Sequence, residues 1–161
     1  MLHETGALLD PSRLHFIGHV PHQTLHDVLR ISACHVYLTV PFVLSWSLLE
    51  AMACGALVVA SATPPVHEVI RDGLNGRLVP FADPLALART IAEVLAHPER
   101  HQPMRRAARR TVLEHYDLAS VCLPQQLALV DRLLAKRRPR TQQPPDHVGP
   151  LLFRPPPPRL R

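Results

Sequence analysis

The chain has 161 residues, of which 47% are hydrophobic and 19% are charged, so it can form a domain with a substantial core. Its net charge of +5 is concentrated in residues 136–161, where seven Lys/Arg and one Asp give +6, so residues 1–135 carry −1. A nearly neutral body argues against nucleic-acid binding, and we expect no nucleic acid as a partner.

Short apolar runs alternate with helix-like segments along the body of the chain. Runs near 14–18, 34–39, 57–61 and 77–80 are typical of buried strands, and the segments between them place apolar residues at helical spacing. Because each run is apolar throughout, we expect an α/β fold, a Rossmann-like parallel sheet of about four strands with helices on both faces.

Helix-forming signals continue beyond the last predicted strand. Asp83-Pro84 is typical of a helix start, and further helical stretches are expected near 99–115 and 118–135. Four arginines of the first stretch favour a solvated face: Arg105, Arg106, Arg109 and Arg110. Residues 136–161 hold 8 of the 18 prolines and cannot bury a core, so we expect a domain at 1–135 and a disordered Pro/Arg-rich tail at 136–161.

Cysteines and histidines do not follow the spacing of common metal motifs. Cys34, Cys54 and Cys122 form no CxxC pair, and the eleven histidines include no HExxH. We expect free, buried cysteines in a reducing, cytoplasmic compartment, with no metal and no cofactor. No apolar run approaches about 20 residues, so we expect no transmembrane segment.

One carboxylate stands out in the segment that follows the 34–39 run. A helix is expected to begin near Ser47 at the carboxyl edge of the sheet, where its free N–H groups would favour a phosphate. Glu50, one turn further on, could accept hydrogen bonds from the hydroxyls of a ribose. Ser47 and Glu50 also fit the S-x-x-E spacing of a capping box, so a purely structural role is the alternative.

The run "SLLEAMACGALVVAS", followed by "PPVHEVIRDGLNGRLVPFADPLALARTIAEVL", closely resembles the donor-binding half of retaining family-four (group 1) glycosyltransferases. "LHFIGHVP" before it and "ARRTVLEHYDL" after it are similar too, so the resemblance covers about residues 13–134. It implies a GT-B C-terminal domain that binds a nucleotide sugar. It also implies that a sugar is transferred with retention when the domain is part of a full-length enzyme.

The resemblance assigns roles to individual positions. Glu50 matches the second acid of the family's E-x7-E motif, which binds the nucleotide ribose. The diphosphate and sugar cradle corresponds to Leu44, Ser45, Trp46 and Ser47, and Trp46 could either stack on a ligand or anchor the core. The loop beside the nucleotide base corresponds to Gly18, His19 and Val20.

Two departures from the family pattern limit this assignment. Phe42 stands where the first acid of the motif is expected, eight residues before Glu50, and it cannot accept hydrogen bonds from a donor sugar. The chain also begins late in the family pattern, so we expect that the acceptor domain and the opening strands of the donor domain are missing.

The leading hypothesis is therefore a glycosyltransferase donor-binding domain, truncated at its N-terminus and inactive in transfer by itself. Its partners would be a nucleotide sugar and an N-terminal acceptor domain, and a full-length enzyme could make peripheral contact with a membrane. The alternative is a nucleotide- or partner-binding module without catalysis.

Overall fold

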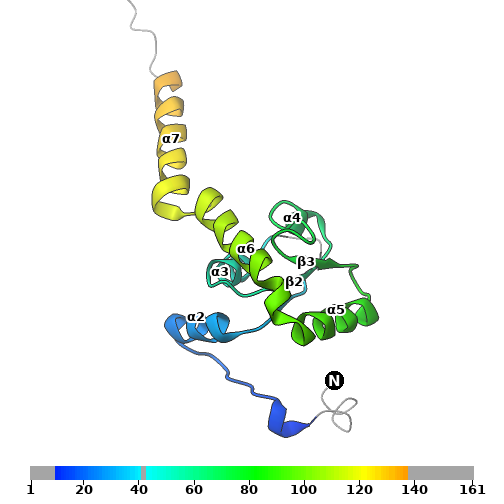
Figure 1. Cartoon of the computed structure of the whole chain (residues 1–161). Coiled ribbons are helices and arrows are strands. Elements are labelled where there is room, and N and C mark those ends of the chain that lie inside the picture. Colours follow the sequence, from blue (N-terminus) through cyan, green and yellow to red (C-terminus); the bar gives the residue numbers. More distant parts are fainter. Residues whose placement is uncertain (1–9, 41–42, 138–161) are drawn as a thin grey trace, which may run out of the picture. The chain divides into compact units, whose positions relative to one another are not determined.

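The computed structural model describes residues 10–40 and 43–137 (Figure 1). They divide into two compact units, with the boundary after Asp117. The helices and strands are α2 (His22–Ile31), β1 (His35–Tyr37), α3 (Trp46–Ala53), β2 (Val58–Ser61), α4 (Pro64–His67), β3 (Arg77–Val79), α5 (Pro84–Ala96), α6 (Gln102–His115) and α7 (Leu123–Arg137). Short 3-10 turns lie at Pro11–Arg13 and Pro98–His101, and a π turn lies at Leu118–Cys122.

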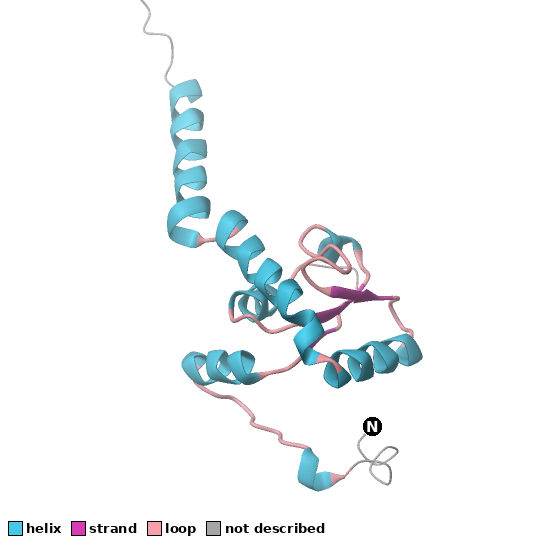
Figure 2. Cartoon of the chain, in the orientation of Figure 1, coloured by secondary structure: helices cyan, strands magenta, loops and turns pink. Residues whose placement is uncertain are grey.

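The sheet of the first unit is parallel throughout, in the order β1-β2-β3. Its strands are magenta in Figure 2, with helices around them. Val36 pairs with Val59, and Ala60 pairs with Leu78. The expected α/β fold is confirmed, with three of the four predicted strands at 35–37, 58–61 and 77–79.

The predicted strand at 14–18 is wrong. This segment pairs with no strand among the described residues, and its apolar side chains Phe16 and Ile17 are 79% and 53% exposed. An extended segment becomes a strand only when a neighbour takes up its backbone hydrogen bonds, and apolar composition alone does not supply that neighbour.

Both faces of the sheet are covered, as the apolar strands predict. Val58 and Ala60 of β2 lie in a core with side chains of α2, α3, α4 and α6. Leu57 and Val59 point to the other face, where they lie in a core with Val94 of α5. Successive side chains of a strand point to opposite faces, so a strand buried on both sides must be apolar at every position.

Arginines of α6 satisfy the carboxyl end of α3. Gly55 follows this helix in a left-handed conformation with φ +78, which glycine adopts without strain at the end of a helix. Arg105 Nε donates to the Gly55 carbonyl at 2.5 Å, and Arg109 donates to the Ala53 carbonyl. Arg106, Arg109 and Arg110 are exposed, as expected of a solvated face, whereas Arg105 is partly buried. Arg105 and Arg109 also complete the hydrogen bonds of a helix end and oppose the negative end of its dipole.

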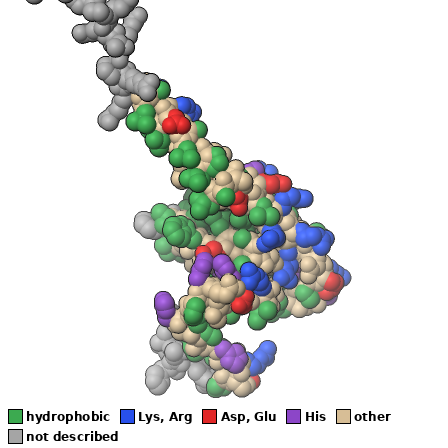
Figure 3. Space-filling model, turned by 90° about the vertical axis from the view of Figure 1, so that its left-hand side faces the viewer, with side chains coloured by type: hydrophobic (Ala, Val, Ile, Leu, Met, Phe, Trp, Pro, Cys, Tyr) green, Lys and Arg blue, Asp and Glu red, His purple; other side chains and the backbone are tan. Residues whose placement is uncertain are grey.

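The second unit is helical in the described residues. Within α7, Leu123, Leu127, Val130 and Leu134 recur at spacings of four, three and four residues, and all are about half exposed. Apolar side chains are visible along α7 in Figure 3. By length and composition alone, the helical stretch Pro98–Lys136 could cross a membrane. Core helices of soluble proteins meet the same two criteria, so the absence of a membrane span stays a prediction.

Candidate functional site

Side chains at the ends of β1 and β2 hold the segment that leads into α3 at the carboxyl edge of the sheet. Tyr37, buried at the end of β1, accepts a hydrogen bond through its hydroxyl from the backbone N–H of Ser45 at 2.9 Å. The Ser61 hydroxyl at the end of β2 bonds to both the N–H and the carbonyl of Thr39, each at 3.1 Å. These bonds fix the segment after β1, and sequence reasoning missed both Tyr37 and Ser61.

The first turn of α3 is capped by Ser45. Its hydroxyl accepts from the backbone N–H of Ser47 at 3.3 Å and also lies 3.0 Å from the Ser47 hydroxyl. The capping-box interpretation, with Ser47 as the cap and Glu50 bonding back to it, is therefore wrong. The helix begins at Trp46, one residue earlier than expected, because Ser45 supplies a cap that the S-x-x-E spacing does not show.

Glu50 instead pairs with a histidine from another helix. Its carboxylate Oε1 lies 2.9 Å from Nε2 of His22 on α2, and the Glu50 side chain is 27% exposed. The ring of His26, one turn along the same helix, lies 4.1 Å from the ring of His22 between centroids. Glu50 is thus oriented by a partner 28 residues away and keeps a solvent-accessible carboxylate.

The predicted Gly18–Val20 loop leads directly into α2. Gly18 has φ +61, a left-handed conformation that favours glycine, and His19 is exposed. Pro21 then precedes the first helical residue, His22. The loop is therefore joined through His22 to the side chain of Glu50.

The predicted cradle residues differ in their surroundings. Leu44 packs partly against the core, whereas Ser45 is exposed and its hydroxyl caps α3. Trp46 is 83% exposed, so it is free to stack on a ligand and does not anchor the core. Phe42 lies outside the described residues.

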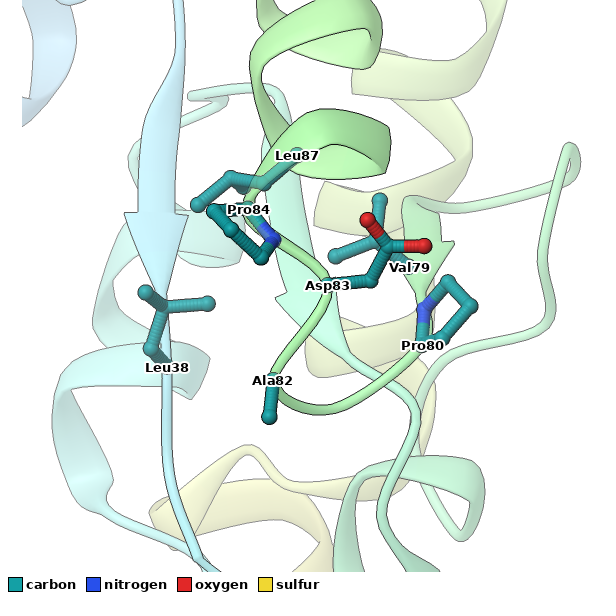
Figure 4. Close-up of a pocket in the computed structure, with 7 residues that line it drawn as sticks. All are labelled: Leu38, Val79, Pro80, Ala82, Asp83, Pro84 and Leu87. Carbon is teal, nitrogen blue, oxygen red and sulfur yellow. The ribbon is translucent and has the colours of Figure 1, made fainter.

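A separate pocket of about 140 Å³ opens at the ends of β1 and β3 (Figure 4). Its lining is mostly apolar and includes Leu38, Val79 and Leu87, while the Asp83 carboxylate accepts from the N–H of Ala86 at 2.9 Å as the cap of α5. The lining includes none of the predicted donor-binding residues. We place the candidate site at α3 and α2, where the charged and polar groups gather.

Two shifted pKa values lie at the start of β1, away from Glu50 in the chain. Burial raises the pKa of the Cys34 thiol, because a low dielectric disfavours the charged thiolate. Burial also lowers the pKa of His35, because a low dielectric disfavours the charged imidazolium. All three cysteines are free, as expected, although they are partly rather than fully buried.

Residues 4–111 match the family described as glycosyl transferases group 1. A 2-deoxystreptamine N-acetyl-D-glucosaminyltransferase from Streptomyces fradiae is 30% identical over 118 residues, which cover 73% of this chain and 28% of that protein.

Solved structures show the same architecture. A sucrose-phosphate synthase from Thermosynechococcus elongatus has a TM-score of 0.73 and 28% identity, over 84% of this chain and 33% of that one. HepE from Anabaena, solved in complex with UDP-glucose, has a TM-score of 0.72 and 21% identity, over 82% of this chain and 36% of that one. The matched region thus spans about a third of each of these two proteins, and the described fold resembles GT-B glycosyltransferase domains.

Proposed function

Because the chain belongs to the group 1 family of glycosyltransferases, we propose that it binds the nucleotide-sugar donor of a sugar-transfer reaction. In this proposal the acceptor is bound by a further domain, and transfer proceeds with retention. We propose retention because residues 13–134 resemble retaining enzymes. We propose a further domain because enzymes of the GT-B arrangement bind donor and acceptor on two domains.

The observation that carries the proposal is the position of Glu50. Its partly exposed carboxylate lies in α3, whose N-terminus follows β1 at the carboxyl edge of a parallel sheet. Ligands of open α/β sheets bind at this edge. An ionised carboxylate held by His22 could accept two hydrogen bonds from the adjacent hydroxyls of a ribose, and such charge-assisted bonds are strong.

The neighbouring groups fit the rest of a donor. The N-terminus of α3 carries the positive end of a helix dipole, which favours a diphosphate. The exposed Trp46 ring could stack on a base or sugar, and the Gly18–Val20 loop would lie beside the base. Support from a known protein comes from HepE, which shares the fold and was solved with UDP-glucose and with UDP.

Calorimetric titration with a panel of nucleotides and nucleotide sugars tests this function. Glu50→Gln should weaken nucleotide binding by about 1.5–3 kcal/mol, roughly 10- to 150-fold, because the amide replaces a charged acceptor. Glu99→Gln, which changes an exposed carboxylate after α5, is the matched control and should bind as the parent does.

Circular dichroism of each variant would show that the fold is retained. Equal affinity of the Glu50→Gln variant and the parent for every nucleotide that binds would refute the role of Glu50. Absence of binding by the parent across the whole panel would refute the donor-binding proposal itself.

A further inference from the structure

We propose that His22, His26 and Glu50 form a binding site for a divalent transition-metal ion such as Zn²⁺. The three side chains each offer one ligand atom, and these atoms all lie within 4.8 Å of one another. Histidine side chains gather beside an acidic side chain on the face of the molecule shown in Figure 3. The inference stands on this arrangement and does not require the proposed donor binding.

The two helices bring the ligands together for simple geometric reasons. His22 and His26 are four residues apart in α2, so their side chains lie on the same face of that helix, with ring centroids 4.1 Å apart. Glu50 reaches them from α3 and places Oε1 2.9 Å from Nε2 of His22. Zinc is commonly held in this way, by two ligands from one helix and a third from a neighbouring element.

The observed spacing is close to that of a filled site. Zinc bonds of about 2.0–2.2 Å in a tetrahedral arrangement place ligand atoms roughly 3.3–3.6 Å apart. The His22–Glu50 distance of 2.9 Å lies just below this range, and the 4.8 Å limit on the whole set lies above it. Small side-chain rotations would therefore be enough to admit an ion without moving the backbone.

The donor set selects the kind of ion. Two imidazoles and one carboxylate suit Zn²⁺ and neighbouring transition metals, whereas Mg²⁺ and Ca²⁺ prefer oxygen ligands. Solvent can reach the site, because the His22 and Glu50 side chains are 65% and 27% exposed. Three protein ligands leave a fourth position for water or for an oxygen atom of a bound solute.

Zinc titration of the untagged full chain, freed of metal by a chelator and without nucleotide, tests the site. We expect one strong binding event, weakened at least tenfold by His26→Ala and by Glu50→Gln. His67→Ala removes an exposed histidine of α4 and should leave the affinity unchanged. This control matters because the chain has other histidines and cysteines that could bind zinc weakly.

Cobalt substitution gives a second readout that does not depend on affinity. Co²⁺ bound to the parent and to His67→Ala should show the intense visible absorption of a tetrahedral ion, and His26→Ala should lose it. No zinc binding by the folded parent, or equal affinity in the parent, His26→Ala and Glu50→Gln, would overturn the proposal. Because nucleotide is absent from these experiments, a failure to bind zinc would not contradict the donor-binding proposal. A failure to bind nucleotide would likewise not contradict the zinc site.

Discussion

The buried side chain of Asn75 holds the turn before β3 through three hydrogen bonds. Its Oδ1 accepts from the N–H of Arg71 at 2.7 Å, and its Nδ2 donates to the Val69 carbonyl at 3.0 Å and to the Thr111 hydroxyl of α6 at 3.1 Å. In the sequence, the pair Asn75-Gly76 is typical of a turn and indicates no contact beyond it. The structure shows that the amide also joins this turn to a helix 36 residues away.

Asn75→Ala should therefore lower the free energy of unfolding by about 2–3 kcal/mol. Alanine leaves the Arg71 N–H and the Val69 carbonyl without their partner, and an unpaired buried polar group costs about 1–3 kcal/mol. Urea unfolding followed by circular dichroism measures the change. A loss of less than about 0.5 kcal/mol would show that water replaces the amide at no cost.

Acidification should destabilise the fold partly through His35. Its pKa is lowered in the folded state by burial, so the unfolded state binds a proton more readily. This contribution to stability is present above the unfolded pKa of about 6.5 and is lost as the pH falls below that value and through the lower folded pKa.

Urea unfolding at about pH 7.5 and 5.5 should show a smaller loss in His35→Gln than in the parent, since glutamine does not titrate. The other ten histidines are common to both proteins, so the comparison isolates His35. Identical losses in the two proteins would contradict the role given to burial.

The connection between β3 and α5 contains a strained residue. Ala82 has φ +63, in the left-handed region where a Cβ atom is disfavoured by about 1–2 kcal/mol. Figure 4 places Ala82 in the turn between Pro80 and Asp83, next to the cap of α5. The side chain of Asp83 fixes the start of the helix, so the turn must absorb the change of direction.

Ala82→Gly should stabilise the protein by about 0.5–1 kcal/mol, because glycine adopts this conformation without strain. The stabilisation is smaller than the strain removed, because glycine also raises the conformational entropy of the unfolded chain. Ala92→Gly, at an exposed position inside α5, is the matched control and should destabilise by about 1 kcal/mol. Thermal unfolding distinguishes the two. Destabilisation by both variants would mean that Ala82 is not strained in solution.

At the scale of the whole molecule, β1 is an edge strand of the described sheet. Among the described residues it pairs only with β2, and the apolar side chains of Val36 within it and Leu38 directly after it are 40% and 57% exposed. Unpaired backbone next to apolar side chains favours association.

Sedimentation at increasing concentration should therefore show self-association, and Val36→Lys with Leu38→Lys should reduce it. Leu95→Lys changes an equally exposed leucine of α5 and should have no such effect. A parent that stays monomeric at high micromolar concentration would contradict this prediction.

The isolated chain should not transfer sugar at an enzyme-like rate. The matched region covers 28% of the Streptomyces fradiae relative, and transfer needs donor and acceptor held together. Such positioning can supply about 7–11 kcal/mol of the barrier. The rate of transfer can be measured as release of nucleotide from a panel of nucleotide sugars, with the Streptomyces fradiae relative as the positive control. Turnover by the chain alone would disprove the expectation.

Sequence by itself determined the elements whose signals are local. The apolar run of β2 predicted a strand buried on both faces, because each of its side chains must meet a helix on one side or the other. Asp83 predicted the start of a helix, since a capping side chain acts on backbone groups a few residues away. Glu50 was also predicted to be a donor-binding residue, and that role stays a prediction.

Only the tertiary structure decided what Glu50 contacts. The S-x-x-E spacing favoured Ser47 as its partner, but the packing of α2 against α3 places His22 there instead, from 28 residues away. For the same reason His26 could not be recognised as a candidate ligand, because the carboxylate that completes the cluster comes from another helix. Spacing along a chain reports neighbours within one element, whereas contacts between elements depend on how their faces pack.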